Sequence, residues 1–205
     1  VTGVQGMRWY EVTVKGQESH TGATPMGLRK NALLGAARMI EAIHQAGMNH
    51  LPGVASVGLI ENRPNSRNVV PGEVFFTVDL RHPDEKVLDQ MEADYQAALP
   101  KIAAELNLEL EEKRIWKSPA VKFAPHLIDC VRAGARQAGY TMREMASGAG
   151  HDAAYIARVA PTTMIFVPCL GGISHNESES TTLEECGAGS QVLLNAMLEY
   201  DRTLA

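Results

Sequence analysis

The sequence has 205 residues, of which 45% are hydrophobic, and its formal net charge at pH 7 is −5. This length allows one large domain or two small ones. The weak negative charge and the lack of a basic cluster argue against a nucleic-acid partner. No apolar run approaches the ~18 residues that a membrane-spanning helix requires, so we expect no membrane partner. The three widely spaced cysteines are typical of free thiols in a reducing compartment, and we expect a cytoplasmic protein.

The first half of the sequence combines strand and helix patterns. Alternating apolar residues predict strands at 8–14, 54–61, 73–81 and 108–116. Apolar residues at helical spacing predict helices at about 27–47 and from Pro83 to about residue 102. This order is that of a ferredoxin-like α+β domain, a four-stranded antiparallel sheet with two helices on one face. We place this domain at 7–116, after the end of a linker at 1–6.

The second half has the pattern of a parallel α/β sheet. Helices are expected at 125–138, from Gly150 onward, and at 183–203 after a capping box of Thr182 and Glu185. Strands are expected at 142–147 and 162–169, and the second of these is almost continuously apolar, as is typical of a strand buried on both faces. Because 117–205 contains few strands, we interpret it as the C-terminal portion of an α/β domain whose N-terminal half is absent. The start at Val1, without an initiator methionine, fits this interpretation.

The strongest local signal for chemistry is GGISHNESE, residues 171–179. His175 follows the predicted strand at 162–169, and open α/β sheets bind ligands beyond the carboxyl ends of their strands. A neutral imidazole there, near the carboxylates of Glu177 and Glu179, is a suitable ligand for Zn²⁺ or a similar ion. The pattern alone favours a simpler alternative, a solvated loop histidine beside two capping carboxylates.

A second signal is SGAGHDAAY, residues 147–155. A glycine-rich turn before a helix presents backbone N–H groups that can hold an anion. Asp152 would lie in the first helical turn, where a carboxylate is favoured. His151 would either bind substrate or cap the helix, and the pattern does not distinguish the two.

Three further polar residues lie at strand ends in the first half. His20 lies in the loop after the first strand, Asn68 in the loop before the strand at 73–81, and Arg81 at the end of that strand. Asparagine offers both a donor and an acceptor, and arginine offers a rigid fork suited to a carboxylate. The simpler alternatives, which the pattern alone favours, are turn chemistry for Asn68 and a surface salt bridge between Arg81 and Asp79.

Four motifs together resemble the hydantoinase/carbamoylase family of amidohydrolases, which is part of the clan of dizinc aminoacylases and exopeptidases. GQESHTGATPMGLRKNAL resembles the lid segment of that family, and PNSRNVVPGEVFFTVDLRHPD resembles its N-V-V-P-G…D-x-R segment. SGAGHDA and GGISHNESE resemble its two catalytic-domain signatures. The resemblance covers essentially the whole chain. It implies a ferredoxin-like lid followed by the C-terminal part of an α/β catalytic domain of the dizinc exopeptidase type.

The resemblance also implies a role for each candidate residue. His175 would be a metal ligand, and His20 would be the lid histidine that stabilises the oxyanion, often in the site of the partner subunit. Asn68 and Arg81 would hold the substrate, Arg81 through the substrate carboxylate. Gly150 and His151 would lie in a loop that contacts the substrate.

The activity that the resemblance implies is metal-dependent hydrolysis of a linear C–N bond in an N-carbamoyl amino acid, a ureido acid or allantoate. Two divalent ions per full-length subunit are implied, either Zn²⁺ or Mn²⁺, Co²⁺ or Ni²⁺, together with a homodimer formed through the lid. The other metal ligands and the catalytic carboxylate of the family have no counterpart in this sequence, so we expect the 205-residue chain alone to be inactive. Two alternatives are an aminoacylase or exopeptidase of the same clan, and a non-catalytic dimerisation module.

Overall fold

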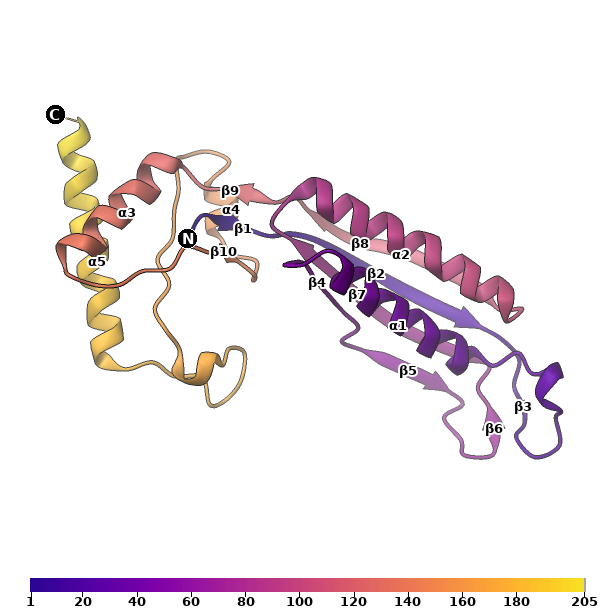
Figure 1. Ribbon diagram of the computed structural model, residues 1–205. Helices are drawn as coiled ribbons and strands as arrows, with labels where there is room; N and C mark the ends of the chain where they lie inside the picture. Colours follow the sequence, from indigo (N-terminus) through magenta and orange to yellow (C-terminus); the bar gives the residue numbers. More distant parts are fainter. Residues whose placement is uncertain (205) are drawn as a thin grey trace. The chain divides into compact units, whose positions relative to one another are not determined.

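The computed structural model describes residues 1–204, which divide into two compact units. The large unit comprises Gln5–Ala120. The small unit comprises Val1–Val4 together with the chain from Val121 onward. Figure 1 shows the helices and strands of both units in chain order. None of the helices within 1–204 is both long enough and apolar enough to cross a bilayer.

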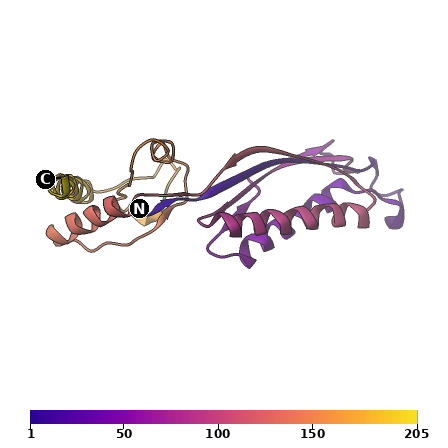
Figure 2. The same ribbon diagram turned by 90° about the horizontal axis from the view of Figure 1, so that it is seen from above.

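The large unit is a five-stranded sheet covered on one face by two helices. Its central strands, β2 (Gly6–Lys15) and β7 (Glu73–His82), pair antiparallel along their whole length. β8 (Glu109–Ser118) borders β2, while β4 (Val54–Ser56) and β5 (Ile60–Arg63) both border β7. Figure 2 shows α1 (Ala32–Asn49) and α2 (Glu85–Glu105) on the same face of this sheet. The ferredoxin-like α+β fold predicted from the sequence is therefore confirmed.

Period-two alternation along the central strands produces the core of the large unit. One set of side chains faces the helices and is buried, namely Tyr10, Val12, Val14, Val74, Phe76, Val78 and Leu80. The predicted apolar stripe of α2 meets them through Leu88, Met91, Tyr95 and Ile102. The alternate residues of both strands point to the other face, which the helices do not cover, and which we call the open face.

Both helices begin at side-chain caps. Asn31 Oδ1 accepts hydrogen bonds from the N–H groups of Leu33 and Leu34, and Asp84 Oδ1 caps α2 in the same way. The cap at Asn31 explains why α1 begins at Ala32 and not near residue 27, where we predicted the helix to start. The earlier residues contain only a short 3-10 turn, η1 (Met26–Leu28).

The predicted strand at 54–61 is divided into β4 and β5. Ser56 pairs with Asp79, and Ile60 pairs with Phe76. This strand therefore has one residue more than β7 over the same span, which is the property of a β-bulge. The alternation of apolar residues did not reveal the extra residue, because it lies in an exposed edge strand.

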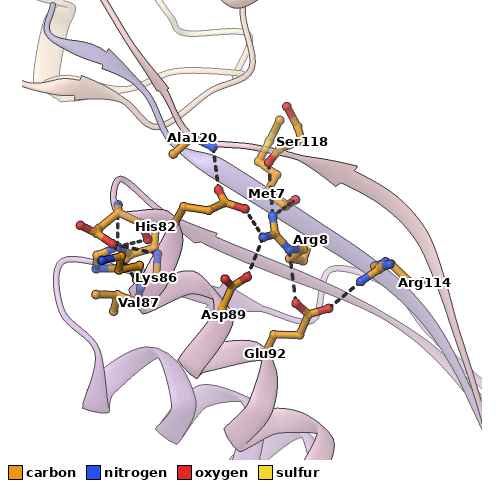
Figure 3. Close-up of polar contacts among 12 residues, drawn as sticks. Met7, Arg8, His82, Lys86, Val87, Asp89, Glu92, Arg114, Ser118 and Ala120 are labelled. Carbon is orange, nitrogen blue, oxygen red and sulfur yellow. Dashed lines mark hydrogen bonds and ion pairs between the residues drawn. The ribbon is translucent and has the colours of Figure 1, made fainter.

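One buried arginine joins the sheet of the large unit to α2. The side chain of Arg8 is fully buried and pairs with three carboxylates of α2, those of Glu85, Asp89 and Glu92 (Figure 3). The Arg8 guanidinium also donates to the carbonyls of Met7 and Ser118, at 3.2 and 3.3 Å. Glu85 accepts a further hydrogen bond from the backbone N–H of Ala120 at 2.8 Å. These contacts, drawn in Figure 3, tie the start of β2 and the end of β8 to one helix.

The small unit contains a three-stranded sheet and three α-helices. β1 (Gly3–Val4), which lies within the predicted linker at 1–6, is its central strand and pairs parallel with β10 (Ala146–Ser147) and antiparallel with β9 (Val121–Lys122). The helices are α3 (Pro125–Gln137), α4 (Ala153–Ile156) and α5 (Leu183–Leu204), and a 3-10 turn, η2 (Leu170–Gly172), precedes α5. The predicted cap of the last helix forms, because Thr182 Oγ1 accepts from the N–H of Glu185 at 3.1 Å.

Three predictions for the small unit are wrong in detail. Residues 162–169, predicted as a buried strand, form no strand and are only half-buried or exposed. A strand requires a neighbour to which its backbone can bond, and no strand within the described part of the chain pairs with this segment. The predicted strand at 142–147 is reduced to its last two residues, and the predicted helix from Gly150 to the four residues of α4.

Candidate functional site

His20 presents one ring nitrogen to solvent and uses the other to shape its own loop. The residue ends β3 (Ser19–His20), and its side chain is exposed. His20 Nδ1 accepts hydrogen bonds from the backbone N–H groups of Gly22 and Ala23, at 3.0 and 3.2 Å. Since Nδ1 is the acceptor, the neutral ring carries its proton on Nε2. The loop therefore holds His20 as a hydrogen-bond donor directed away from the backbone.

Asn68 lies beside His20. β3 pairs with β6 (Val69–Val70), so that His20 lies opposite Val69, and the carbonyl of Asn68 accepts from the N–H of Thr21 at 3.1 Å. The Asn68 side chain accepts a hydrogen bond from the Ser66 hydroxyl at 2.8 Å, which is the turn chemistry favoured by the pattern alone. The sequence did not reveal this two-stranded pairing, because β3 and β6 are only two residues long.

Arg29 braces the same loop and was missed by the sequence analysis. Its Nε donates to the carbonyl of Thr24 at 3.0 Å, and its Nη2 donates to the carbonyl of Thr21 at 2.5 Å. Arg29 lies within the lid motif GQESHTGATPMGLRKNAL, and its position after a turn-rich run was the available signal. It holds the backbone on either side of Gly22, on which the orientation of His20 depends.

Arg81 lies at the other end of the sheet. β7 begins at Glu73, where the His20 and Asn68 loops leave the sheet, and the N–H of Gly16 donates to the carbonyl of Gly72 there. Arg81 is eight residues further along the strand, a distance of about 27 Å at the rise of an antiparallel strand. The structure brings His20 and Asn68 together but does not bring Arg81 to them within one chain.

Arg81 makes the salt bridge with Asp79 that the pattern favoured. Its Nε lies 3.0 and 3.1 Å from the two carboxylate oxygens, and its Nη2 lies 2.6 Å from Oδ2. The hydrogen bonds to Asp79 raise the pKa of Arg81 above its usual value, against the opposing effect of partial burial. Asp79 and Arg81 are two residues apart on a strand, so both side chains share the open face.

His175 is exposed in the loop between η2 and α5. Its backbone is in the left-handed region, with φ of 56°, as is that of Gly171 and Gly172 before it. The backbone N–H of His175 donates to Glu179 Oε2 at 2.8 Å. Glu179 thus closes the loop on itself, which is the simpler of the two roles considered for it.

The glycine-rich turn before α4 is exposed at Gly150 and His151. His151 Nδ1 accepts from the N–H of Ala153 at 3.1 Å, so His151 caps the short helix. Asp152 makes no side-chain cap hydrogen bond, and its backbone carbonyl accepts from Tyr155 and Ile156. The helix-capping alternative for His151 is therefore present in the structure.

The described residues do not fit a catalytic metal ion by themselves. Within 1–204, no group of three or more His, Cys, Asp or Glu side chains lies close enough together to hold one. A catalytic zinc takes about three protein ligands. His175 could supply one such ligand, and the others would have to come from beyond these residues.

Comparison with known proteins identifies the family to which the chain belongs. The profile of Peptidase family M20/M25/M40 matches residues 19–199. The chain belongs to this family. The M20 family is generally one of two-metal enzymes.

Several of the proteins that resemble the chain are amidohydrolases. The chain is 47% identical to an N-carbamoyl-L-amino-acid amidohydrolase of Rhizobium meliloti over 97% of this chain and 48% of the relative. It is 34% identical to the allantoate amidohydrolase of Escherichia coli K12, over 94% of this chain and 47% of the relative. A crystal structure of a hydantoinase/carbamoylase family amidase from Burkholderia multivorans superposes with a TM-score of 0.93 at 52% identity, over 96% of this chain and 48% of that chain. The chain spans about half the length of the curated relatives it matches, and the resemblance predicted from its motifs is confirmed.

Proposed function

We propose that the full-length protein hydrolyses the linear C–N bond of an N-carbamoyl amino acid or of a related ureido acid such as allantoate. The observation that carries this proposal is the 47% identity to an N-carbamoyl-L-amino-acid amidohydrolase along 97% of the chain, since this span includes all four motifs that resemble the family. The large unit would be the lid and dimerisation domain, and the small unit would be part of the catalytic domain. The three cysteines are free, which supports a cytoplasmic enzyme.

Each candidate residue has a chemical role in this proposal. The Nε2–H of His20 would donate to the oxygen that becomes negatively charged when the carbamoyl carbon turns tetrahedral. Arg81 would bind the substrate carboxylate, with Asp79 holding the guanidinium in place, and Asn68 would help to orient the substrate. Gly150 and His151 would contact the substrate. His175 would be one ligand of a site for two divalent ions, Zn²⁺ or Mn²⁺, Co²⁺ or Ni²⁺.

The function is tested by ammonia release from an N-carbamoyl-L-amino acid by the full-length protein, together with its metal content. We expect ammonia release to depend on bound metal and to fall by about 10³-fold in His175→Ala, which should also hold less metal. His44→Ala, which removes another exposed histidine, is the control and should change neither. Cleavage of N-acyl amino acids without ammonia release would favour an aminoacylase. A stable dimer that binds no metal would favour a dimerisation module.

We propose further that the protein is a homodimer joined along the edge formed by β4 and β5. Exposed apolar side chains gather on this edge, on the neighbouring α1 and in the turn between them, namely Leu34, Met48, Leu51, Val54, Leu59 and Ile60. Of the large hydrophobic side chains exposed in residues 1–204, none belongs to α2. β4 is the last strand on its side of the sheet, so its outer backbone groups can pair with another strand.

A two-fold axis at this edge would place separated residues together. Antiparallel pairing of two identical edge strands sets the Arg81 end of one sheet beside the Glu73 end of the other. Three strand spacings, about 14 Å, would then separate β7 from its copy, compared with the ~27 Å that separates the two ends within one chain. His20 and Asn68 of one subunit could thus join Arg81 of its partner in one site.

The edge is tested by Ile60→Lys, which places a charge on β5. We expect the dissociation constant of the dimer, measured by analytical ultracentrifugation, to rise at least 100-fold, because a lysine would be buried in the interface. Ile115→Lys on β8 is the matched control, since Ile60 and Ile115 are 49% and 44% exposed, and it should leave the dimer intact. Dissociation by Ile115→Lys but not by Ile60→Lys would show that the subunits join along β8 instead.

A further inference from the structure

An aromatic pair lies on the open face of the large unit, beside Arg81. Trp9 of β2 lies directly opposite Asp79 of β7 on one side and directly opposite Trp116 of β8 on the other. Directly opposite residues of antiparallel strands point to the same face. Trp9, Trp116 and Asp79 therefore form one row across the open face, and Arg81 lies in the adjacent row.

The two indole rings form one exposed apolar surface. Their centroids are 6.3 Å apart with an angle of 40° between the ring planes. Trp9 is 38% exposed and Trp116 is 42% exposed. Aromatic side chains of this size contribute most free energy when they are covered, so their joint exposure indicates a surface that binds something.

The two exposed tryptophans lie at the Arg81 end of the open face, whereas Phe75 of β7, at the Glu73 end of the same face, is half-buried. Further along β2 and β8 the rows on this face are polar or charged, with Glu11 opposite Lys113, Thr13 opposite Glu111, and Lys15 opposite Glu109. One guanidinium with apolar neighbours on this face is complementary to a ligand with one carboxylate and one apolar group.

We propose that Trp9 and Trp116 form the surface that receives the substrate side chain while Arg81 binds the substrate carboxylate. This inference rests on the proposed function and refines its substrate class to N-carbamoyl amino acids with an aromatic or branched aliphatic side chain. Diagonal neighbours on adjacent strands, such as Trp9 and Arg81, lie ~7–8 Å apart, a span that an amino-acid carboxylate and side chain can bridge. Allantoate carries two polar ureido groups and no apolar group, so it would gain nothing from the indoles.

The test uses the intrinsic fluorescence of the 205-residue chain, because Trp9 and Trp116 are its two tryptophans and both lie in the proposed site. The probes are N-carbamoyl-L-phenylalanine and N-carbamoylglycine, which share the carboxylate and the ureido group and differ in the side chain. We expect both to change the emission saturably, with a half-saturation concentration at least tenfold lower for the phenylalanine derivative. Equal half-saturation for the two probes, or no response to either at 10 mM, would overturn the proposal.

Variants separate the indoles from the guanidinium. In Trp9→Ala, with Trp116 as the reporter, the ratio of the two half-saturation concentrations should fall toward one, whereas Trp9→Phe should keep most of the preference. An unchanged ratio in Trp9→Ala, with the fold verified by circular dichroism, would sink the inference. Arg81→Gln should weaken the binding of both probes and so raise both half-saturation concentrations. If it raises neither, the proposed binding of the substrate carboxylate by Arg81 is wrong, and the role of the indoles is not what has failed. If only the role of the indoles is wrong, the proposed function still stands, because ammonia release by the full-length protein tests it separately.

Discussion

Arg81→Ala and His20→Ala are each expected to lower kcat/KM of the full-length enzyme by about 10²–10³-fold, and co-expression of the two inactive chains is expected to restore activity. Loss of one preorganised donor or carboxylate clamp costs a factor of this size. Arg81 lies ~27 Å along β7 from Glu73, the end of the strand at which the His20 loop leaves the sheet. Restoration follows because a site that combines the two residues then needs both subunits. Ammonia release by all the dimers purified from the co-expression is the measurement.

The expected recovery can be stated as a fraction. Random pairing makes half of the dimers mixed, and in each mixed dimer one site combines an intact Arg81 with an intact His20 of the partner subunit. About a quarter of the sites are then complete, and about a quarter of the wild-type rate should return. The matched control is co-expression of His20→Ala with Asn68→Ala, because these residues lie side by side on one chain and every mixed site stays defective. No recovery in the test pair would show that each site takes Arg81 and His20 from the same chain.

Arg8→Met is expected to lower the free energy of unfolding of the large unit by about 3–5 kcal/mol at pH 7. The Arg8 side chain is fully buried, and its removal would leave the carboxylates of Glu85 and Asp89 without their cation and Glu92 with Arg114 alone (Figure 3). It would also leave the carbonyls of Met7 and Ser118 without the Arg8 hydrogen bonds. Chemical denaturation of the 205-residue chain, followed by circular dichroism, measures the change.

Arg38→Met provides the comparison for this cluster. Arg38 also carries a salt bridge to an α2 carboxylate, that of Glu105 at 2.6 Å, but both side chains are exposed. An exposed pair contributes at most about 1 kcal/mol, because water screens it. If Arg38→Met lowers the free energy of unfolding as much as Arg8→Met does, burial of the Arg8 cluster adds nothing to stability.

The Arg8 effect should also depend on pH. Burial alone would raise the pKa of Glu92, but the hydrogen bonds from Tyr10 and Arg114 and the charges of Arg8 and Arg114 lower it below its usual value. A carboxylate with a lowered folded-state pKa stabilises the protein above its unfolded pKa of about 4.3, and this stability is lost as pH falls through the folded value. The difference between wild type and Arg8→Met should therefore shrink below pH 4, and a constant difference from pH 7 to pH 3 would contradict the assignment.

Local patterns in the sequence were sufficient to predict most helices and strands of the large unit. The alternation of Val74, Phe76, Val78 and Leu80 predicts a strand with one buried face, because period two is a property of a single strand. The same alternation contained an unused signal at Arg8, which shares its face with Tyr10 and Val12 and therefore had to be buried. The residue types at His20, Asn68, Arg81 and His175 were informative only together, through their resemblance to a family.

The tertiary structure decided the features that depend on neighbours distant in the sequence, namely strand pairing, register and the positions of the candidate site residues. Residues 162–169 have the composition of a buried strand, yet no strand of the described chain pairs with them, and composition cannot supply a partner. The separation of Arg81 from His20 follows from the register of β2 with β7 and from the pairing of β3 with β6, which join residues about 50 to 76 apart in the chain. Periodicity is set by adjacent residues and can be read from the sequence, whereas register and pairing are set by packing across the whole sheet.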